Sequence, residues 1–219
     1  MIRIEHVTKT YVKGEHTVKA LDDVSLEALK GEFVVVKGAS GCGKTTLLLT
    51  AGGLLHPQVG KVFINNQDLY HLSQKEMSDF RSANIGFVFQ QYHLIPYLSI
   101  LENITIPSLA HEEQLPEHHA IALIEDLGLK DRMHHTPGEL SAGEKQRTAL
   151  GRALLYQPKV ILADEITGNL DDKNATMVLA KLTEFVKSGG TVLLVTHDEK
   201  AFTYADRIIE LEKLKIISI

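Results

Sequence analysis

The chain alternates between short apolar runs and longer stretches in which apolar residues recur at helical spacing. The short runs are rich in β-branched residues, which favour extended backbone, and they predict strands. They comprise residues 2–7, 24–29, 33–37, 61–65, 85–89, 160–164, 191–196, 207–211 and 215–218. Strands near both ends of the chain with helices between them indicate an α/β core.

The strand signals vanish from residue 91 to residue 157. Helical patterns fill this stretch, most clearly at residues 115–127 and 141–156. We therefore predict an α/β core formed by residues 1–90 and 158–219, with a mostly helical subdomain of residues 91–157 inserted into it.

The composition is that of a globular protein with a sizeable core, since 44% of the 219 residues are hydrophobic and 23% are charged. A net charge of −5 without a long basic run argues against nucleic acid as a partner. A single cysteine excludes an internal disulfide and suits a reducing compartment. There is no run of about 18 apolar residues and no signal-peptide core, so we expect a cytoplasmic chain that reaches a membrane only through a partner.

Residues 38–45 read GASGCGKT and fit the pattern G-x-x-x-x-G-K-[ST] between the predicted strand 33–37 and an apolar helix. Glycines let the backbone approach an anion, and successive N–H groups at a helix N-terminus point at phosphates. Lys44 then reaches the β- and γ-phosphates, and the Thr45 hydroxyl ligates Mg²⁺. The alternative is a glycine-rich turn with an exposed lysine. The candidate ATP-binding residues of this segment are Gly38, Ala39, Ser40, Gly41, Cys42, Gly43, Lys44, Thr45 and Thr46.

A second phosphate-binding element is predicted at residues 140–147, which read LSAGEKQR. Ser141 and Glu144 form a capping box, and an ordinary capped helix is the alternative. Gly143 favours a ligand. Glycine in the first turn of a helix destabilises the helix by about 0.5–1 kcal/mol relative to alanine, and close approach of a phosphate to the backbone is one reason for a glycine there. One nucleotide needs only one cradle, so the second element implies a site shared between two copies of the chain.

Asp164 and Glu165 end the apolar run 160–164, at the edge where open α/β sheets bind ligands. Asp164 is expected in the Mg²⁺ shell, and Glu165 is expected to orient or deprotonate a water for attack on the γ-phosphorus. The alternative is a helix N-cap at the end of a strand.

With these motifs in this order, the chain resembles ATP-binding-cassette ATPases over essentially its whole length. The resemblance implies a single nucleotide-binding domain, residues 1–219, with a P-loop NTPase (RecA-like) core, an antiparallel β subdomain and an inserted α-helical subdomain. It implies that Gln90 is a Mg²⁺ ligand that senses the membrane partner, that His197 contacts the γ-phosphate, and that Tyr11 stacks on adenine. Asp171, in the segment GNLD, resembles the aspartate loop of the family.

The resemblance further implies an ATPase that binds ATP and Mg²⁺ and forms a head-to-tail homodimer. ATP on the cradle of one copy is then closed by Ser141 and Gly143 of the other, and the pair drives a separate membrane permease from the inner face of the membrane. The catalytic residues implied are Lys44, Gln90, Glu165 and His197, and the metal ligands are Thr45, Gln90 and Asp164. The chain departs from the family at Ala142, where glycine is usual, and at Ile166, where proline is common.

Three segments resemble one branch of this family, the lipoprotein-releasing, macrolide-exporting and cell-division ATPases. They are the apolar stretch 90–103, residues 49–55 and the segment GNLD. Tyr92, Leu94, Ile95 and Tyr97 are candidates for a permease docking patch, with core packing as the alternative.

A regulatory module at the cell envelope that transmits motion without moving cargo stays open as the second function. A small-molecule kinase is disfavoured because residues 141–147 would then have no role. For the histidines we favour solvated side chains over a metal cluster; they are His111, His118, His119, His134 and His135.

Overall fold

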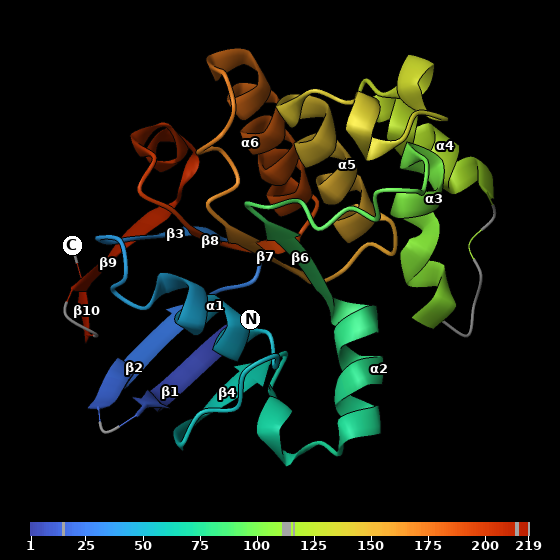
Figure 1. Cartoon of the computed structure of the whole chain (residues 1–219). Helices are drawn as coiled ribbons and strands as arrows, with labels where there is room; N and C mark the ends of the chain where they lie inside the picture. Colours follow the sequence, from blue (N-terminus) through green and yellow to red (C-terminus); the bar gives the residue numbers. More distant parts are fainter. Residues whose placement is uncertain (15, 111–114, 116, 213–214, 219) are drawn as a thin grey trace.

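The larger of two sheets forms the centre of the predicted α/β core (Figure 1). The structure is a computed structural model that describes residues 1–14, 16–110, 115, 117–212 and 215–218. The neighbouring strands of the larger sheet pair in parallel except β10 and β9, which are antiparallel. The strand order is β10 (Lys215–Ser218), β9 (Arg207–Glu212), β3 (Phe33–Lys37), β8 (Thr191–Val195), β7 (Val160–Asp164) and β6 (Ile85–Phe89).

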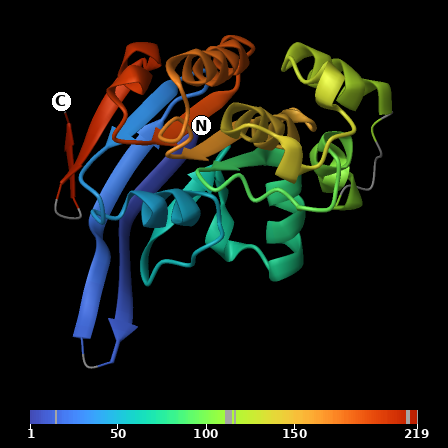
Figure 2. The same cartoon turned by 45° about the horizontal axis from the view of Figure 1, so that its top comes forward.

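The second sheet is antiparallel, in the order β2 (His16–Ala28), β1 (Ile2–Lys13), β4 (Val59–Ile64) and β5 (Gln67–Asp68). The predicted bounds 2–7 and 24–29 are wrong, because β1 and β2 stay paired as far as Lys13 opposite His16. The added residues are mostly polar, so they lack an apolar alternation, and inter-strand backbone hydrogen bonds keep them extended instead. Figure 2 shows this hairpin running well past the other elements. The short β5 was not predicted, and the remaining strands agree with their predicted ranges to within two residues.

The helices cover both faces of the parallel sheet. Helix α1 (Lys44–Ala51) lies between the two sheets and contacts strands of both (Figure 1). Helices α3 (Ile100–Thr105), α4 (Glu117–Asp126), α5 (Ala142–Leu154) and α6 (Asp172–Lys187) lie on the opposite side, and α2 (Gln74–Asn84) leads into β6. The predicted helices 115–127 and 141–156 correspond to α4 and α5. Short 3-10 helices are Leu69–His71, Ile106–Ala110, Lys130–Arg132, Pro137–Glu139 and Glu199–Tyr204.

Successive side chains of β3 show how the core is divided. Val34 and Val36 join the cluster that contains α1 and the antiparallel sheet. Phe33 and Val35 join a second cluster on the other face, with buried residues of α3, α4, α5 and α6. Because side chains of a strand alternate between faces, a continuous apolar run fills both layers.

Between β6 and β7 the described residues form helices and no strand. These helices have no core of their own, since Ile104 of α3 and Leu150 of α5 belong to the same cluster as Val35 of the sheet. The division into a core and an inserted subdomain at residues 91 and 157 stays a prediction. Among the described helices, none has both the length and the hydrophobicity that a bilayer crossing requires.

Candidate functional site

The strand ends at one edge of the parallel sheet surround a cavity of about 620 Å³. Gln90 directly follows β6, Asp164 ends β7, His197 lies two residues beyond β8, and the loop of residues 38–43 follows β3. Carboxyl ends of parallel strands share one edge, and this edge is where such sheets bind ligands. The lining residues are Ala20, Gly38, Ala39, Ser40, Gly41, Gly43, Lys44, Thr45, Thr46, Gln90, Asp164, Glu165 and His197.

The loop before α1 has the backbone that its glycines predict. Gly43, at the N-terminus of α1, has φ 102°, and a Cβ there would lie 2.2 Å from the carbonyl oxygen of Ala20. Both the conformation and the space therefore require glycine. The carbonyl of Gly43 accepts the first helical bond from the Leu47 N–H at 2.8 Å. A helix with free N–H groups thus begins directly at the cavity, as an anion site needs.

Lys44 is buried rather than exposed, which contradicts the alternative of a simple turn with an exposed lysine. Its ammonium donates to the carbonyls of Gly38 at 2.7 Å and Ala39 at 3.1 Å. Glu165 Oε1 is 3.7 Å from the same nitrogen. The positive charge is therefore held over the loop, between main-chain oxygens and a carboxylate.

Asp164 presents an unsatisfied oxygen to the cavity. The residue is only 8% exposed, and its Oδ1 has no hydrogen-bond partner among the described residues. Burial raises the pKa of this carboxyl, and the Thr45 hydroxyl bond and the Lys44 charge lower it in part. A buried carboxylate oxygen without a partner costs free energy unless a cation or water meets it. Together with the Thr45 hydroxyl and the Gln90 amide, it forms the oxygen-donor set that Mg²⁺ prefers.

Glu165 is fixed by hydrogen bonds from the segment after β8. Its Oε2 accepts from the Thr196 hydroxyl at 2.8 Å and from the His197 N–H at 3.2 Å, and its Oε1 lies 2.9 Å from His197 Nδ1. Burial raises the pKa of the Glu165 carboxyl, but the hydrogen bonds from His197 and Thr196 outweigh it and hold the pKa below its ordinary value. The carboxylate is thus ionised at neutral pH. Its φ of 48° is a strained conformation for a non-glycine residue, a feature that clusters at functional sites.

Two predicted ATP-binding residues flank the cavity without lining it. Tyr11 comes from the hairpin, is 41% exposed, and has its hydroxyl 3.4 Å from Thr46 Oγ1, so its ring stands beside the loop. Cys42 turns inward and packs against the core, with its sulfur 2.7 Å from where a Cβ of Gly38 would be. The prediction missed Ala20, which lines the cavity through an unremarkable residue type, so no chemical signal marks it in the sequence.

Ser141, Gly143 and Asp171 lie at helix starts outside this cavity. The capping box is confirmed, since Ser141 Oγ donates to Glu144 Oε2 at 2.8 Å and accepts from the Glu144 N–H at 3.3 Å. Asp171 caps α6. Gly143 is buried against Asn174, and a Cβ at Gly143 would lie 2.2 Å from Asn174 Cγ. A contact within the chain therefore already accounts for glycine at position 143, so the glycine by itself no longer argues for a ligand, and the assignment of Gly143 to the ATP site stays a prediction.

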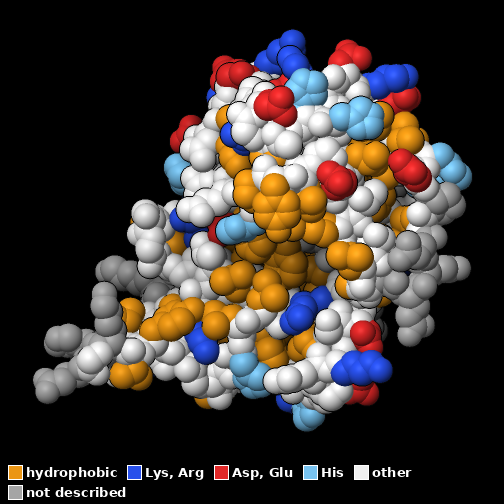
Figure 3. Space-filling model, turned by 45° about the vertical axis from the view of Figure 1, so that its right-hand side comes forward, with side chains coloured by type: hydrophobic (Ala, Val, Ile, Leu, Met, Phe, Trp, Pro, Cys, Tyr) orange, Lys and Arg blue, Asp and Glu red, His pale blue; other side chains and the backbone are white. Residues whose placement is uncertain are grey.

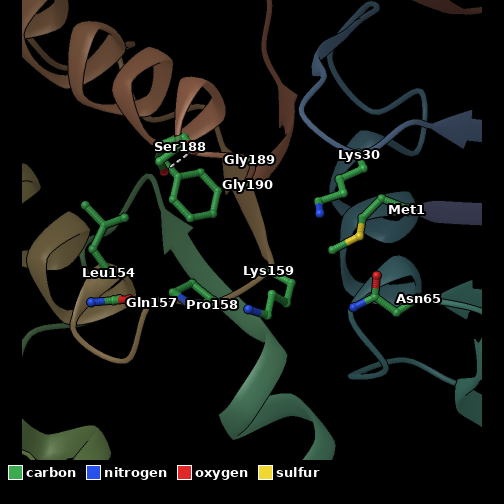
Figure 4. Close-up of a pocket in the computed structure, with 11 residues that line it drawn as sticks. Met1, Lys30, Asn65, Leu154, Gln157, Pro158, Lys159, Ser188, Gly189 and Gly190 are labelled. Atoms are coloured by element: carbon green, nitrogen blue, oxygen red, sulfur yellow. Dashed lines mark hydrogen bonds between the residues drawn. The ribbon is translucent and has the colours of Figure 1, made fainter.

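A second cavity, of about 630 Å³, lies at the opposite edge of the sheet (Figure 4). Lys30 and Lys159, which precede β3 and β7, project into it, and the loop after α6 forms one wall. No carboxylate or histidine occurs among its described lining residues. The carbonyl ends of α5 and α6 offset the lysine charge there. Its volume matches that of the first cavity, but none of the site residues predicted from the sequence lines it.

The predicted docking residues divide between core and surface. Tyr92 and Leu94 are half-buried and pack on the core, as the alternative predicted, whereas Tyr97 is 79% exposed. Figure 3, which faces the side that carries α2, α3 and α4, shows hydrophobic side chains gathered in the middle of that face with charged groups around them.

The histidines form no metal site in the part of the chain that the structure describes, where no three His, Cys, Asp or Glu side chains come together as metal ligands. The rings of His118 and His119 are in contact, with centroids 4.4 Å apart and planes tilted by 59°. His111 lies outside the described residues.

Comparison with known proteins agrees with this geometry. Residues 21–168 match the family described as ABC transporter. The chain is 42% identical over 216 residues to the putative hemin import ATP-binding protein HrtA of Staphylococcus aureus strains Newman and RF122, covering 97% of each chain. It is also similar to two dimeric structures of the ATP-binding cassette MJ0796. The structure of its post-hydrolysis state with ADP and Pi has a TM-score of 0.93 at 36% identity, and the match covers 100% of this chain and 98% of that chain.

The other MJ0796 structure, a dimer of this bacterial ABC transporter cassette, has a TM-score of 0.93 at 38% identity, with 99% of this chain and 96% of that chain covered. The fold and the family therefore agree with the geometry of the loop and the two carboxylates. The chain belongs to the ABC transporter family, as an ATP-binding subunit of the kind that hydrolyses ATP.

Proposed function

We propose that this subunit hydrolyses ATP with Mg²⁺ as half of a head-to-tail homodimer that drives a separate membrane permease. One observation carries the proposal: a single cavity brings together a buried lysine, an orphaned carboxylate oxygen and an ionised carboxylate paired with a histidine. These groups come from Lys44, from the neighbouring residues Asp164 and Glu165, and from His197, so three segments that are far apart in the sequence contribute them.

The loop and α1 hold the phosphates through backbone N–H groups. Lys44 leaves the carbonyls of Gly38 and Ala39 when a phosphate replaces them, because a charge-assisted bond to an anion is stronger than one to a neutral carbonyl. Tyr11 offers an exposed ring beside Thr46 on which adenine stacks.

Thr45, Gln90 and Asp164 hold the metal ion in this proposal. When bound, Mg²⁺ supplies charge neutralisation at the β- and γ-phosphate oxygens. The unpaired Asp164 Oδ1 supports this assignment, since the residues present leave that oxygen for a ligand.

Glu165 positions the water and accepts its proton. The water oxygen attacks the γ-phosphorus, the bond from that phosphorus to the bridging oxygen breaks, and ADP and phosphate result. A carboxylate held ionised at neutral pH is ready to accept the proton. His197 lines the same cavity beside Glu165, where it is proposed to meet the γ-phosphate.

The second half of the site comes from another copy. Ser141 and Ala142 are exposed at the N-terminus of α5, and neither lines the chain's own cavity, which leaves that helix start for a partner's phosphate. The similar MJ0796 cassettes are dimeric, which supports the same arrangement here. Ile166, where the family often has proline, is buried in the core and leaves Glu165 bonded, so the departure is expected to be tolerated.

The membrane partner is proposed to dock where the side chain of Tyr97 is exposed. We infer a permease of the lipoprotein-releasing or efflux type, which places the subunit on the cytoplasmic face of the membrane. Because relatives at 42% identity are named for hemin import, hemin is the second cargo class to test. Vesicles with the co-purified permease, assayed for ATP-dependent movement of lipoprotein or hemin, distinguish these cargoes from a module that only transmits motion.

The central test is the Glu165→Gln variant with ATP and Mg²⁺. It retains the geometry without the proton acceptor, so ATP persists and the dimer accumulates. Light scattering after gel filtration is expected to give twice the monomer mass with ATP and the monomer mass with ADP. Glu117→Gln, an exposed change on α4, is the control and is expected not to accumulate a dimer. A variant that stays monomeric with ATP would contradict the proposal.

A further inference from the structure

The side-chain amide of Asn174 joins the first turns of α5 and α6. Its Nδ2 donates to both carboxylate oxygens of Asp171, at 3.0 and 2.9 Å, and its backbone N–H donates to Asp171 Oδ1 at 2.8 Å. Its Oδ1 accepts from Nη1 of Arg147 on α5. One amide therefore completes the cap of α6 and pairs with a cation of the neighbouring helix.

The same amide occupies the space beside Gly143. A Cβ on Gly143 would lie 2.2 Å from both Cγ and Oδ1 of Asn174 and 2.7 Å from its Nδ2. Distances below 3.0 Å are not found for real Cβ atoms. The amide has no simple way to move, because Asp171 holds its nitrogen and Arg147 holds its oxygen. A side chain at position 143 would therefore separate α5 from α6 or break these bonds.

Arg147 extends the contacts to Ser141. It is 9% exposed, and Glu144 and Asp171 both stabilise its charge. Glu144 in turn bonds the N–H and the hydroxyl of Ser141, each at 2.8 Å. Hydrogen bonds and charge–charge attraction together thus connect the N-terminus of α5 with the aspartate loop, and Asn174 is the member that bonds across the two helices.

We propose that Asn174 is a positioning residue whose amide, rather than an approaching ligand, requires glycine at position 143. It sets the spacing between Ser141 and Asp171, the two elements that the dimer presents to the partner's nucleotide. This inference rests on the proposed function only for its effect on dimerisation, since the contact itself lies within one chain.

The test is a double-mutant cycle in the Glu165→Gln background, with Gly143→Ala and Asn174→Ala alone and combined. The dimer dissociation constant with ATP and Mg²⁺ is measured by analytical ultracentrifugation. Gly143→Ala is expected to weaken the dimer at least about tenfold when Asn174 is present, from overpacking, and less than about threefold on the Asn174→Ala background, where the overlapping atoms are gone. An equal loss on both backgrounds would assign the glycine to the ligand and overturn the proposal.

Asn174→Ala alone is expected to weaken the dimer about tenfold while ADP affinity, measured by calorimetry, stays within about twofold, because none of its contacts reaches the cavity. Asn174→Asp keeps the shape but sets a like charge against Asp171, so it is expected to weaken the dimer as well. Asn84→Ala, at the end of α2, is the matched control and leaves the dimer unchanged. A dimer of wild-type strength in Asn174→Ala, or an equal loss in Asn84→Ala, would refute a positioning role.

Thermal unfolding of the same four proteins separates failure of this inference from failure of the proposed dimer. If the Glu165→Gln protein never dimerises, the proposed function fails, but Gly143→Ala is still expected to lower the melting temperature more with Asn174 present than without it. Equal shifts in the two backgrounds would overturn the contact itself.

Discussion

His197 Nδ1 lies 2.9 Å from Glu165 Oε1, so the exposed histidine and the partly buried carboxylate form a pair in the lining of the cavity. The pair is held from β8, because the His197 N–H and the Thr196 hydroxyl bond the other carboxylate oxygen. Any change at His197 therefore acts on the proposed proton acceptor as well as on the γ-phosphate.

His197→Ala removes this imidazole and is expected to lower kcat for ATP hydrolysis about 10²-fold, the loss typical when one preorganised donor is removed. ADP affinity is expected to stay within about threefold, since the ring contacts Glu165 rather than the phosphate loop. Phosphate release and calorimetry check the two effects. His134→Ala, on an exposed surface, should behave like the wild type, and an unimpaired His197→Ala enzyme would remove the histidine from the mechanism.

Lys44→Ala is expected to weaken ATP binding by about 10- to 100-fold, the effect of losing a charge-assisted hydrogen bond to a phosphate. The loop carbonyls of Gly38 and Ala39 also lose their donor, so the loop itself is less ordered. Titration calorimetry with ATP and Mg²⁺ measures the affinity, and Lys75→Ala on the exposed face of α2 is the control. Affinity equal to that of the wild type would mean that the lysine serves only the loop.

Asp164→Asn is expected to stabilise the nucleotide-free protein while abolishing Mg²⁺-dependent hydrolysis. Burial raises the folded-state pKa of Asp164 above its ordinary value of 3.8, so folding disfavours the charged form. This free-energy cost of folding is absent at pH values well below 3.8, and it is fully present once the pH exceeds the raised pKa of Asp164. At neutral pH the neutral amide should therefore raise the melting temperature.

The same comparison at low pH is the control for Asp164→Asn. Well below pH 3.8 the wild-type carboxyl is protonated in both folded and unfolded chains, so the difference in melting temperature should shrink. A difference that stays constant with pH would show that the charge of Asp164 is not its cause.

Alkylation of Cys42 is expected to block nucleotide binding, because the thiol is packed between Gly38 and the core and an adduct has no room without displacing the loop. Cys42→Ala should bind ATP within about threefold of the wild type and be insensitive to the reagent. Mass spectrometry verifies that the modification of Cys42 is complete, and calorimetry then measures the affinity for ATP. An unchanged affinity would contradict the packing argument.

The sequence by itself determined the parts of this protein that depend on neighbouring residues. The loop of residues 38–45, the capping box at Ser141 and the parallel strands follow from glycine conformation, local hydrogen bonds and apolar runs, and the structure confirms them. These features are local, so their physics acts within a few residues of chain.

Only the tertiary structure decided contacts between distant segments. The polar half of the hairpin is extended because β1 and β2 pair, Cys42 faces the core because Gly38 and Leu211 lie beside it, and Gly143 is glycine because α6 places Asn174 against it. No local pattern encodes such partners, since each depends on where packing brings residues that are far apart along the chain.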